Sequence, residues 1–453
     1  MRVAQVRVGP FFVLVVSSLV ACSGASSAGS PRGAGGAGMS FAGEAGANAS
    51  NAGSDAGAAG TGTSNEGEAG AAGADTSSAG EGGTAGADTS DAGSDSGGGL
   101  SDTPKPPLAG LIDMQDISWH NTADAEPSFT MDNVSPEYDG IFGGIVVNAT
   151  WDALQPTSGA GLDFSTVDAA LAQVEAYNAA HPSTPLGTKL RVYGGANAPT
   201  WAKAIGGPIS IQRNPQGCQS GNCPLTIGAI WTPEYIAAWR SFQVALAARY
   251  DRNPLVRHVT VTSCGQQTDE PFVPTVDTDS KANLASAGFS DDAQKACLLG
   301  AIDDYAPWLF TNVDFTINTF SPTSGKGDAT VFPESVMNAC RTKFGSRCVL
   351  GNHALATPLR AADQGVYDAL EAVGGPISFQ TEAPQGMACL WTQTIAQGVA
   401  LGAGSVEIWP KKQLGGFRSL SAANLVQLAA EFATPIAVEP NPTRPALPCA
   451  GFY

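Results

Sequence analysis

Two spacings of apolar residues alternate along the chain after residue 105. Short runs rich in branched and aromatic side chains are typical of buried strands, and segments with apolar residues three and four positions apart are typical of amphipathic helices. The short runs predict eight strands, over residues 108–114, 144–148, 189–193, 258–263, 313–318, 348–351, 377–381 and 405–409.

Helical patterns follow all of these strands except the first. They cover residues 165–180, a helix that begins at 232–233, and residues 291–310, 333–344, 361–373, 391–401 and 421–433. Ser165 and Asp168 stand at capping-box spacing, and Thr232 precedes Pro233 as a cap residue before a first-turn proline. No convincing helix pattern lies between the first and second strands, over residues 119–139.

Alternating strands and helices predict a parallel sheet, and eight such units in about 345 residues predict a closed (β/α)8 TIM barrel over residues 105–453. The alternative is a doubly wound open sheet. That fold usually carries a Gly-rich phosphate loop after its first strand, and no such loop follows residue 114.

The N-terminus has the pattern of an export signal. Arg2 and Arg7 precede an apolar run over residues 11–20, which is too short to span a bilayer. The run ends in the sequence Leu-Val-Ala before Cys22 and resembles a bacterial lipobox, which implies a signal peptide over residues 1–22 and a diacylated Cys22 as membrane anchor. An ordinary cleavage site with an incidental cysteine is the alternative. We expect an outer-membrane or cell-surface lipoprotein.

Residues 23–104 consist mainly of Gly, Ala, Ser, Asp and Glu, with Phe41 as the one aromatic residue. Such a segment cannot bury enough apolar surface to offset its chain entropy, so we expect a disordered linker with a reach of order 50 Å. It holds ten acidic residues and one arginine, and the whole chain has a net charge of -18. This acidic balance argues against nucleic acid as a partner.

Two carboxylates follow predicted strands at the barrel end where active sites lie. Glu270 comes after the fourth strand in "SCGQQTDEP", and Glu382 ends the seventh strand in "SFQTEAP". The carboxyl ends of barrel strands carry the catalytic residues of this fold. One carboxyl group could protonate a leaving oxygen while the other attacks an anomeric carbon. The pair therefore indicates glycosidic bond cleavage.

This arrangement resembles the clan A glycoside hydrolases. They are retaining (β/α)8 enzymes whose acid/base glutamate follows strand four and whose nucleophilic glutamate ends strand seven. The stretch "WDALQPTSGAGLDFSTVDAALAQ" from Trp151 is similar to their segment after strand two. The resemblance implies that Glu270 is the acid/base and Glu382 the nucleophile. The family usually has Asn before the acid/base, where this chain has Asp269, and Asp269 is the substitute candidate for that role.

Further residues match family positions that contact the sugar. Arg191 in "KLRVYGG" resembles the strand-three position beneath the nucleophile, His353 in "GNH" a strand-six position, and Trp409 in "EIWP" the tryptophan that floors the sugar subsite. Trp201 and Gln380 complete the expected substrate-binding set with Asp269. Each of these residues has a structural alternative, such as a core position for the two tryptophans.

Glu407 lies inside the eighth predicted strand. We interpret it as a structural ion-pair partner of Arg191 or Lys411 in preference to a catalytic group. The four histidines lie far apart without zinc-site spacing, and no "GxSxG" sequence indicates a hydrolase serine. We therefore expect neither a metal nor an organic cofactor.

The chain has nine cysteines, and eight remain once Cys22 is set aside as the lipidation candidate. This even number suits an oxidising compartment. The expected pairs are Cys218 with Cys223, Cys340 with Cys348, Cys264 with Cys297, and Cys389 with Cys449. The last two are the less constrained by spacing, and a free buried thiol is the alternative for Cys264.

The leading hypothesis is a monomeric, lipid-anchored retaining glycoside hydrolase that acts on extracellular polysaccharide or glycoside through Glu270 and Glu382. The first alternative is a carbohydrate-binding or adhesion lipoprotein on a barrel without activity, which the substitution at Asp269 favours. The second alternative is a structural envelope lipoprotein that binds no ligand.

Overall fold

The computed structural model describes residues 103–117, 126–212, 224–272, 277–323, 330–387, 390–412 and 415–439. The predicted signal peptide, the predicted lipid attachment site at Cys22 and the predicted linker up to residue 102 lie outside the described residues. The same holds for Cys218, Cys223, Cys389 and Cys449, so the two disulfides predicted between them stay predictions. Within the described ranges, no helix has the length and apolar character needed to cross a membrane.

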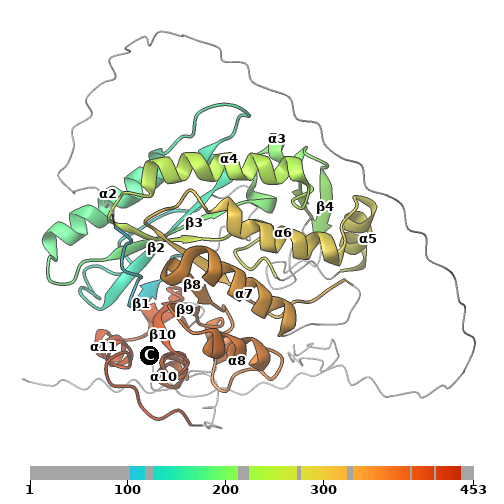
Figure 1. The fold of residues 1–453 in the computed structure, drawn as a ribbon. Helices are drawn as coiled ribbons and strands as arrows, with labels where there is room; N and C mark the ends of the chain where they lie inside the picture. The colour runs from blue at the N-terminus through green and yellow to red at the C-terminus, as the bar shows by residue number, and fades with distance from the viewer. Residues whose placement is uncertain are drawn as a thin grey trace, which may run out of the picture. The chain divides into compact units, whose positions relative to one another are not determined.

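Eight parallel strands close into a barrel, as the sequence predicts (Figure 1). Around the ring, each strand pairs in parallel with the next, and the last pairs with the first. In this order they are β1 (Gly110–Asp113), β2 (Phe142–Thr150), β3 (Gly187–Tyr193), β6 (Val256–Thr260), β7 (Asn312–Thr316), β8 (Cys348–Gly351), β9 (Ile377–Gln380) and β10 (Ala403–Ile408).

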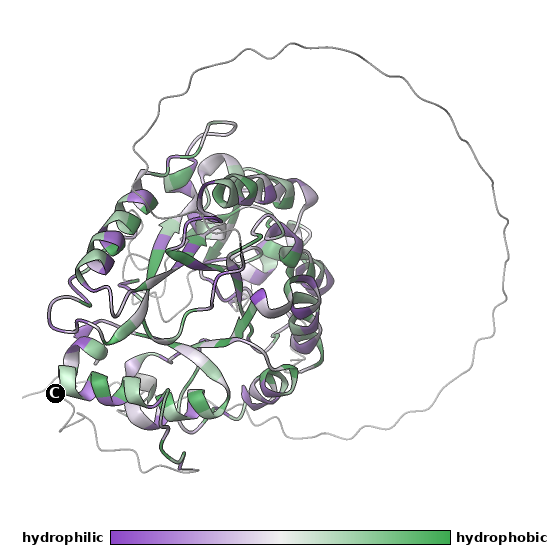
Figure 2. Cartoon of the chain, turned by 60° about the vertical axis from the view of Figure 1, so that its left-hand side comes forward, coloured by the Kyte–Doolittle hydropathy of each residue, from purple (hydrophilic) through white to green (hydrophobic). Residues whose placement is uncertain are grey.

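A long helix follows every barrel strand from β2 onward. In chain order these helices are α2 (Ser165–Ala180), α4 (Pro233–Tyr250), α6 (Asp291–Asp304), α7 (Val331–Phe344), α8 (Gln364–Val373), α10 (Trp391–Ala400) and α11 (Ala422–Ala430). Figure 2 shows the helices around the ring of strands, with apolar and polar residues on each helix. In residues 103–117 and 126–141, β1 is followed by no helix, in agreement with the missing pattern in the sequence.

Shorter elements fill the connections. They are the helices α1 (Trp151–Leu154), α3 (Thr200–Lys203), α5 (Thr278–Ser286) and α9 (Pro384–Met387), the 3-10 turns at Gly195–Asn197, Gly345–Arg347 and Phe417–Ser419, and the hairpin strands β4 (Ile209–Gln212) and β5 (Pro224–Ile227). The antiparallel hairpin packs with α5 around a small apolar cluster that includes Ile211, Leu284 and Phe289. The sequence pattern predicted neither the hairpin nor α5.

Two local predictions about helices were wrong. Ser165 and Asp168 form no capping box: the cap position is Phe164, and Asp163 accepts the Ser165 N–H at 2.9 Å. Asp168 instead binds α4, where it accepts from Tyr250 at 2.9 Å. The helix expected over residues 291–310 ends at Asp304, because Pro307 disfavours helical backbone at the residue before it.

Two of the predicted disulfides are present. Cys264 pairs with Cys297 of α6, and Cys340 pairs with Cys348 across the turn that leads into β8. The first bridge ties the segment after β6 to the helix that covers it. The free-thiol alternative for Cys264 is therefore wrong.

Candidate functional site

The predicted site residues gather at the carboxyl ends of the barrel strands. Arg191 comes from β3, Glu270 from the segment after β6, His353 from beyond β8, Glu382 from beyond β9, and Trp409 directly follows β10. Because all eight strands run in parallel, these positions lie at one end of the barrel, where the fold places its active sites.

The segment after β6, residues 261–270, is called the β6 loop here, and it is held on several sides. Its Cys264 has a φ of 66° and is bridged to α6. The carbonyl of Gln266 accepts the Ala196 N–H at 2.8 Å, and the Gln267 amide donates to the Gln212 carbonyl of the hairpin at 3.1 Å. The unpredicted hairpin thus supports the loop that presents Glu270.

Asp304 of α6 also anchors the β6 loop. Its carboxylate accepts from the Ser263 hydroxyl at 3.0 Å and pairs with Arg240 at 3.0 Å. Burial raises the pKa of Asp304 to about 6, although these two partners oppose the rise. The β6 loop is therefore held to α6 by a carboxyl group with a raised pKa, that of Asp304.

Glu270 is partly buried, and its carboxylate accepts a hydrogen bond from the Asn318 amide at 2.9 Å. Asn318 lies just beyond β7 and was not singled out from the sequence. Its position two residues after a strand end is the signal that could have indicated it. The printed partner of the Glu270 carboxylate is thus a neutral amide.

Asp269 points into the barrel end and is nearly fully buried. Its Oδ2 lies 2.7 Å from Arg191 Nε and 3.7 Å from His353 Nε2. His353 Nε2 also lies 3.0 Å from the Thr316 hydroxyl. A carboxylate is favoured opposite a guanidinium, which gives a physical reason for aspartate where the clan A pattern has asparagine.

Arg191 is the centre of a charged cluster inside the barrel. Its Nη2 lies 2.7 and 2.6 Å from the two oxygens of Glu407, which also binds Lys189. Lys189 Nζ lies 3.1 Å from Asp314, and Asp314 lies 3.0 Å from His258 Nδ1. All these side chains are buried, so each charge depends on its partners.

Burial raises the pKa of Glu407, but the cations Arg191 and Lys189 outweigh that effect and hold the pKa below its usual range. Glu407 is therefore a charged structural partner of Arg191, one of the two partners that the sequence left open. The other, Lys411, lies 3.4 Å from Asp116 instead.

Glu382 follows β9, and its N–H donates to the Leu355 carbonyl at 2.9 Å, which extends the strand pairing beyond Gln380. Its side chain is 21% exposed and forms an ion pair with Arg360, a residue that the sequence did not suggest. Gln380 is buried in β9 and lies in register with Glu407. Glu382 thus carries a cationic partner where Glu270 has a neutral one.

The two predicted tryptophans differ in their surroundings. Trp409 is partly exposed, and its indole N–H donates to the Thr381 carbonyl at 3.0 Å, which places it beside Glu382. Trp201 packs edge-on against buried Trp151 with ring centres 5.3 Å apart, and its N–H donates to the Gln155 carbonyl. Trp409 is therefore the better placed of the two to contact a ligand near Glu382.

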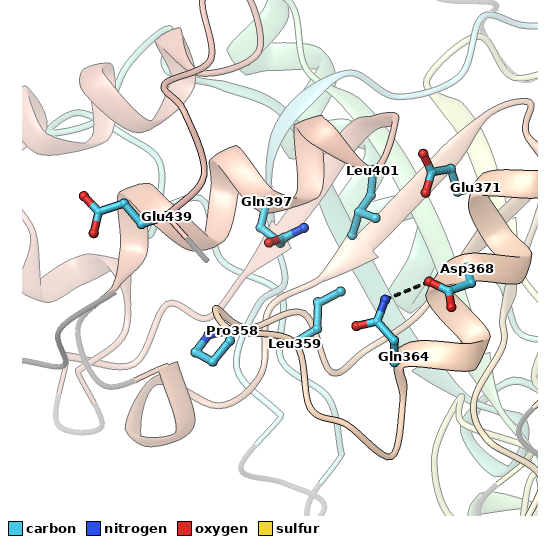
Figure 3. Close-up of a pocket in the computed structure, with 8 residues that line it drawn as sticks. All are labelled: Pro358, Leu359, Gln364, Asp368, Glu371, Gln397, Leu401 and Glu439. Atoms are coloured by element: carbon cyan, nitrogen blue, oxygen red, sulfur yellow. Dashed lines mark hydrogen bonds between the residues drawn. The ribbon is translucent and has the colours of Figure 1, made fainter. Parts of the chain in front are cut away.

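Other features of the described part of the chain lie apart from this cluster. Its residues contain no group of three or more His, Cys, Asp or Glu side chains placed to hold a metal ion. A pocket lined by α8 and α10 carries Asp368, Glu371 and Glu439, together with Leu359 and Leu401 (Figure 3). None of the predicted site residues lines that pocket.

No protein-family model and no curated protein matches the chain. Similar solved structures include an endoglycoceramidase II from Rhodococcus sp. as a lactosyl-enzyme intermediate, at 14% identity, with 68% of this chain and 75% of that chain covered and a TM-score of 0.42. The endoglucanase Cel5A of Pseudomonas stutzeri has 12% identity, 74% and 97% coverage and a TM-score of 0.40. A GH5 family lichenase from Caldicellulosiruptor sp. F32 has 12% identity, 74% and 96% coverage and a TM-score of 0.38.

Proposed function

We propose that this protein is a retaining glycoside hydrolase, exported and anchored through Cys22, that acts on carbohydrate outside the cytoplasm. The observation that carries the proposal is the contrast between two carboxylates at the same barrel end. Glu270 is bound by the amide of Asn318, whereas Glu382 is bound by the guanidinium of Arg360. Different surroundings separate the roles of two carboxyl groups in one site.

In the proposed first step, Glu270 gives its proton to the leaving oxygen as the bond from that oxygen to the anomeric carbon breaks. A carboxylate oxygen of Glu382 bonds to the anomeric carbon in the same step. In the second step, Glu270 takes a proton from water, the water oxygen bonds to the anomeric carbon, and Glu382 leaves as carboxylate. Trp409, beside Glu382, would lie against a sugar ring.

The test is a panel of polysaccharides and aryl glycosides of both anomers, assayed with the wild type, Glu382→Gln, Glu270→Gln and the control Glu371→Gln, an exposed residue of α8. We expect release of sugar by the wild type and the control, and a loss of at least about a thousandfold for Glu382→Gln, since removal of an acting nucleophile has effects of this size. Equal rates for Glu382→Gln and the wild type would contradict the proposal.

The second candidate is a carbohydrate-binding lipoprotein without activity. The ion pair of Asp269 with Arg191 favours it, because the residue beside the proposed acid is committed to a structural contact. Binding of a polysaccharide by the wild type without any release of sugar, unchanged by Glu382→Gln, would support this candidate over the first.

A further inference from the structure

The carboxylate of Glu382 has one cation beside it among the residues that the structure describes. Arg360 Nη2 forms an ion pair with Glu382 Oε1, and no other described Lys, Arg or His lies within 4 Å of that carboxylate. The buried cations of the barrel have other partners: Arg191 pairs with Glu407 and Asp269. The charge next to Glu382 therefore comes from outside the barrel interior.

Arg360 lies in the connection between β8 and α8, and this connection is fastened on two sides. Leu355 donates its N–H to the Gln380 carbonyl at 3.2 Å and accepts the Glu382 N–H at 2.9 Å. Farther along, the Thr319 hydroxyl donates to the Ala362 carbonyl at 3.1 Å. The backbone on both sides of Arg360 is thus fixed relative to β9 and to the end of β7.

The side chain of Arg360 remains half exposed, at 49%. The neighbouring Pro358 and Leu359 line the pocket between α8 and α10 (Figure 3). Because the backbone around Arg360 is fixed, its guanidinium can stay close to the Glu382 carboxylate throughout a reaction. The guanidinium also stays in contact with water, because the side chain is half exposed. This arrangement suits an electrostatic role at Glu382 more than a role in the packed core.

We infer that Arg360 is a positioning residue whose guanidinium stabilises the Glu382 carboxylate as it departs from the covalent glycosyl-enzyme. The inference rests on the proposed function. In the second step the bond between the anomeric carbon and the Glu382 oxygen breaks, and its electron pair returns to the carboxylate. Negative charge therefore grows beside Arg360 in that step, whereas it declines in the first step, when Glu382 attacks. Preorganised charge accelerates the step in which the opposite charge develops.

Loss of the guanidinium should therefore slow the second step more than the first. A hydrogen bond to a charged group is stronger than one between neutral groups, and solvent weakens it at a half-exposed side chain, so we expect about a tenfold slower second step. Glycosyl-enzyme should accumulate in Arg360→Gln on a substrate with a fast first step. A purely structural role for Arg360 would lower turnover without this accumulation.

The experiment uses the full chain and the dinitrophenyl glycoside of the sugar that the wild type cleaves fastest. Enzyme is quenched during turnover, and its intact mass gives the fraction that carries one glycosyl unit. We compare the wild type with Arg360→Gln, Arg360→Met and the charge-conserving Arg360→Lys. Arg249→Gln is the control, because Arg249 is 53% exposed and pairs with Asp168 away from the site.

We expect a severalfold higher glycosyl-enzyme fraction and an initial burst of dinitrophenol for Arg360→Gln and Arg360→Met, wild-type behaviour for Arg249→Gln, and partial return to it for Arg360→Lys. Turnover of Arg360→Gln within twofold of the wild type would overturn the inference, as would lower turnover without accumulation. A wild type that cleaves no glycoside would overturn the proposed function itself. If Arg360→Gln does not fold, the same criteria apply to Arg360→Met.

Discussion

Glu407 offers a quantitative test of the charged cluster inside the barrel. Arg191 Nη2 lies 2.7 and 2.6 Å from the two oxygens of its carboxylate, and Lys189 also donates to that carboxylate. Glu407→Gln keeps the size of the side chain but removes its charge. In this variant Arg191 still pairs with Asp269 at 2.7 Å, and Lys189 still pairs with Asp314 at 3.1 Å. Each cation therefore keeps one buried carboxylate as its partner.

We therefore expect a loss near the lower end of the range for a broken buried ion pair, about 3 kcal/mol in the free energy of unfolding. Because the pKa of Glu407 is held below its usual value, its contribution is complete above the unfolded value of about 4.5 and declines as the pH falls from there through the lower, folded value. The loss should thus be equal at pH 7 and pH 6.

The assay is urea unfolding followed by tryptophan fluorescence, with Glu371→Gln as the control for an exposed glutamate of α8. The control should lie within about 0.5 kcal/mol of the wild type. A loss below about 1 kcal/mol for Glu407→Gln at pH 7 would refute the importance assigned to this cluster.

Three further perturbations test separate parts of the site. Asp269→Asn should keep catalysis within about tenfold of the wild type, whereas Asp269→Ala, which leaves Arg191 Nε without a polar partner, should lose far more in kcat/KM. Burial raises the pKa of Asp113 at the end of β1 to about 7, so wild-type stability should fall as the pH rises from about 4 to 7. In urea unfolding, Asp113→Asn should therefore be more stable than the wild type by roughly 1–3 kcal/mol at pH 8, with little difference at pH 4. Removal of the Cys264–Cys297 bridge by paired serine substitution should cost about 4 kcal/mol of unfolding free energy, since it closes a loop with a sequence separation of 33 residues; an unchanged thermal midpoint would contradict this.

The sequence predicted the barrel because each strand is a compact apolar run flanked by turn residues. The predicted and observed bounds agree for β8 and for α2, and they differ by at most three residues at the ends of the other barrel strands. The hairpin of β4 and β5 was missed because four-residue strands with an exposed alternate position give little periodic signal, and one of them begins with Pro224.

The contacts within the candidate site were harder to predict. The ion pair of Arg191 with Glu407 joins residues 216 positions apart, and only the closure of the barrel brings them together; the sequence offered two partners for Glu407, and the structure selected one. Asn318 and Arg360 lie in connections without any motif. Their roles depend on the path of the backbone, which local patterns do not encode.

The central claim, cleavage of a glycosidic bond by Glu270 and Glu382 with retention, is tested most directly by the configuration of the first product. Proton NMR during hydrolysis of the best aryl glycoside separates the two anomers before they interconvert. The proposed double displacement predicts that the released sugar first appears in the anomeric configuration of the substrate. First appearance of the opposite anomer would contradict the proposed role of Glu382 as nucleophile.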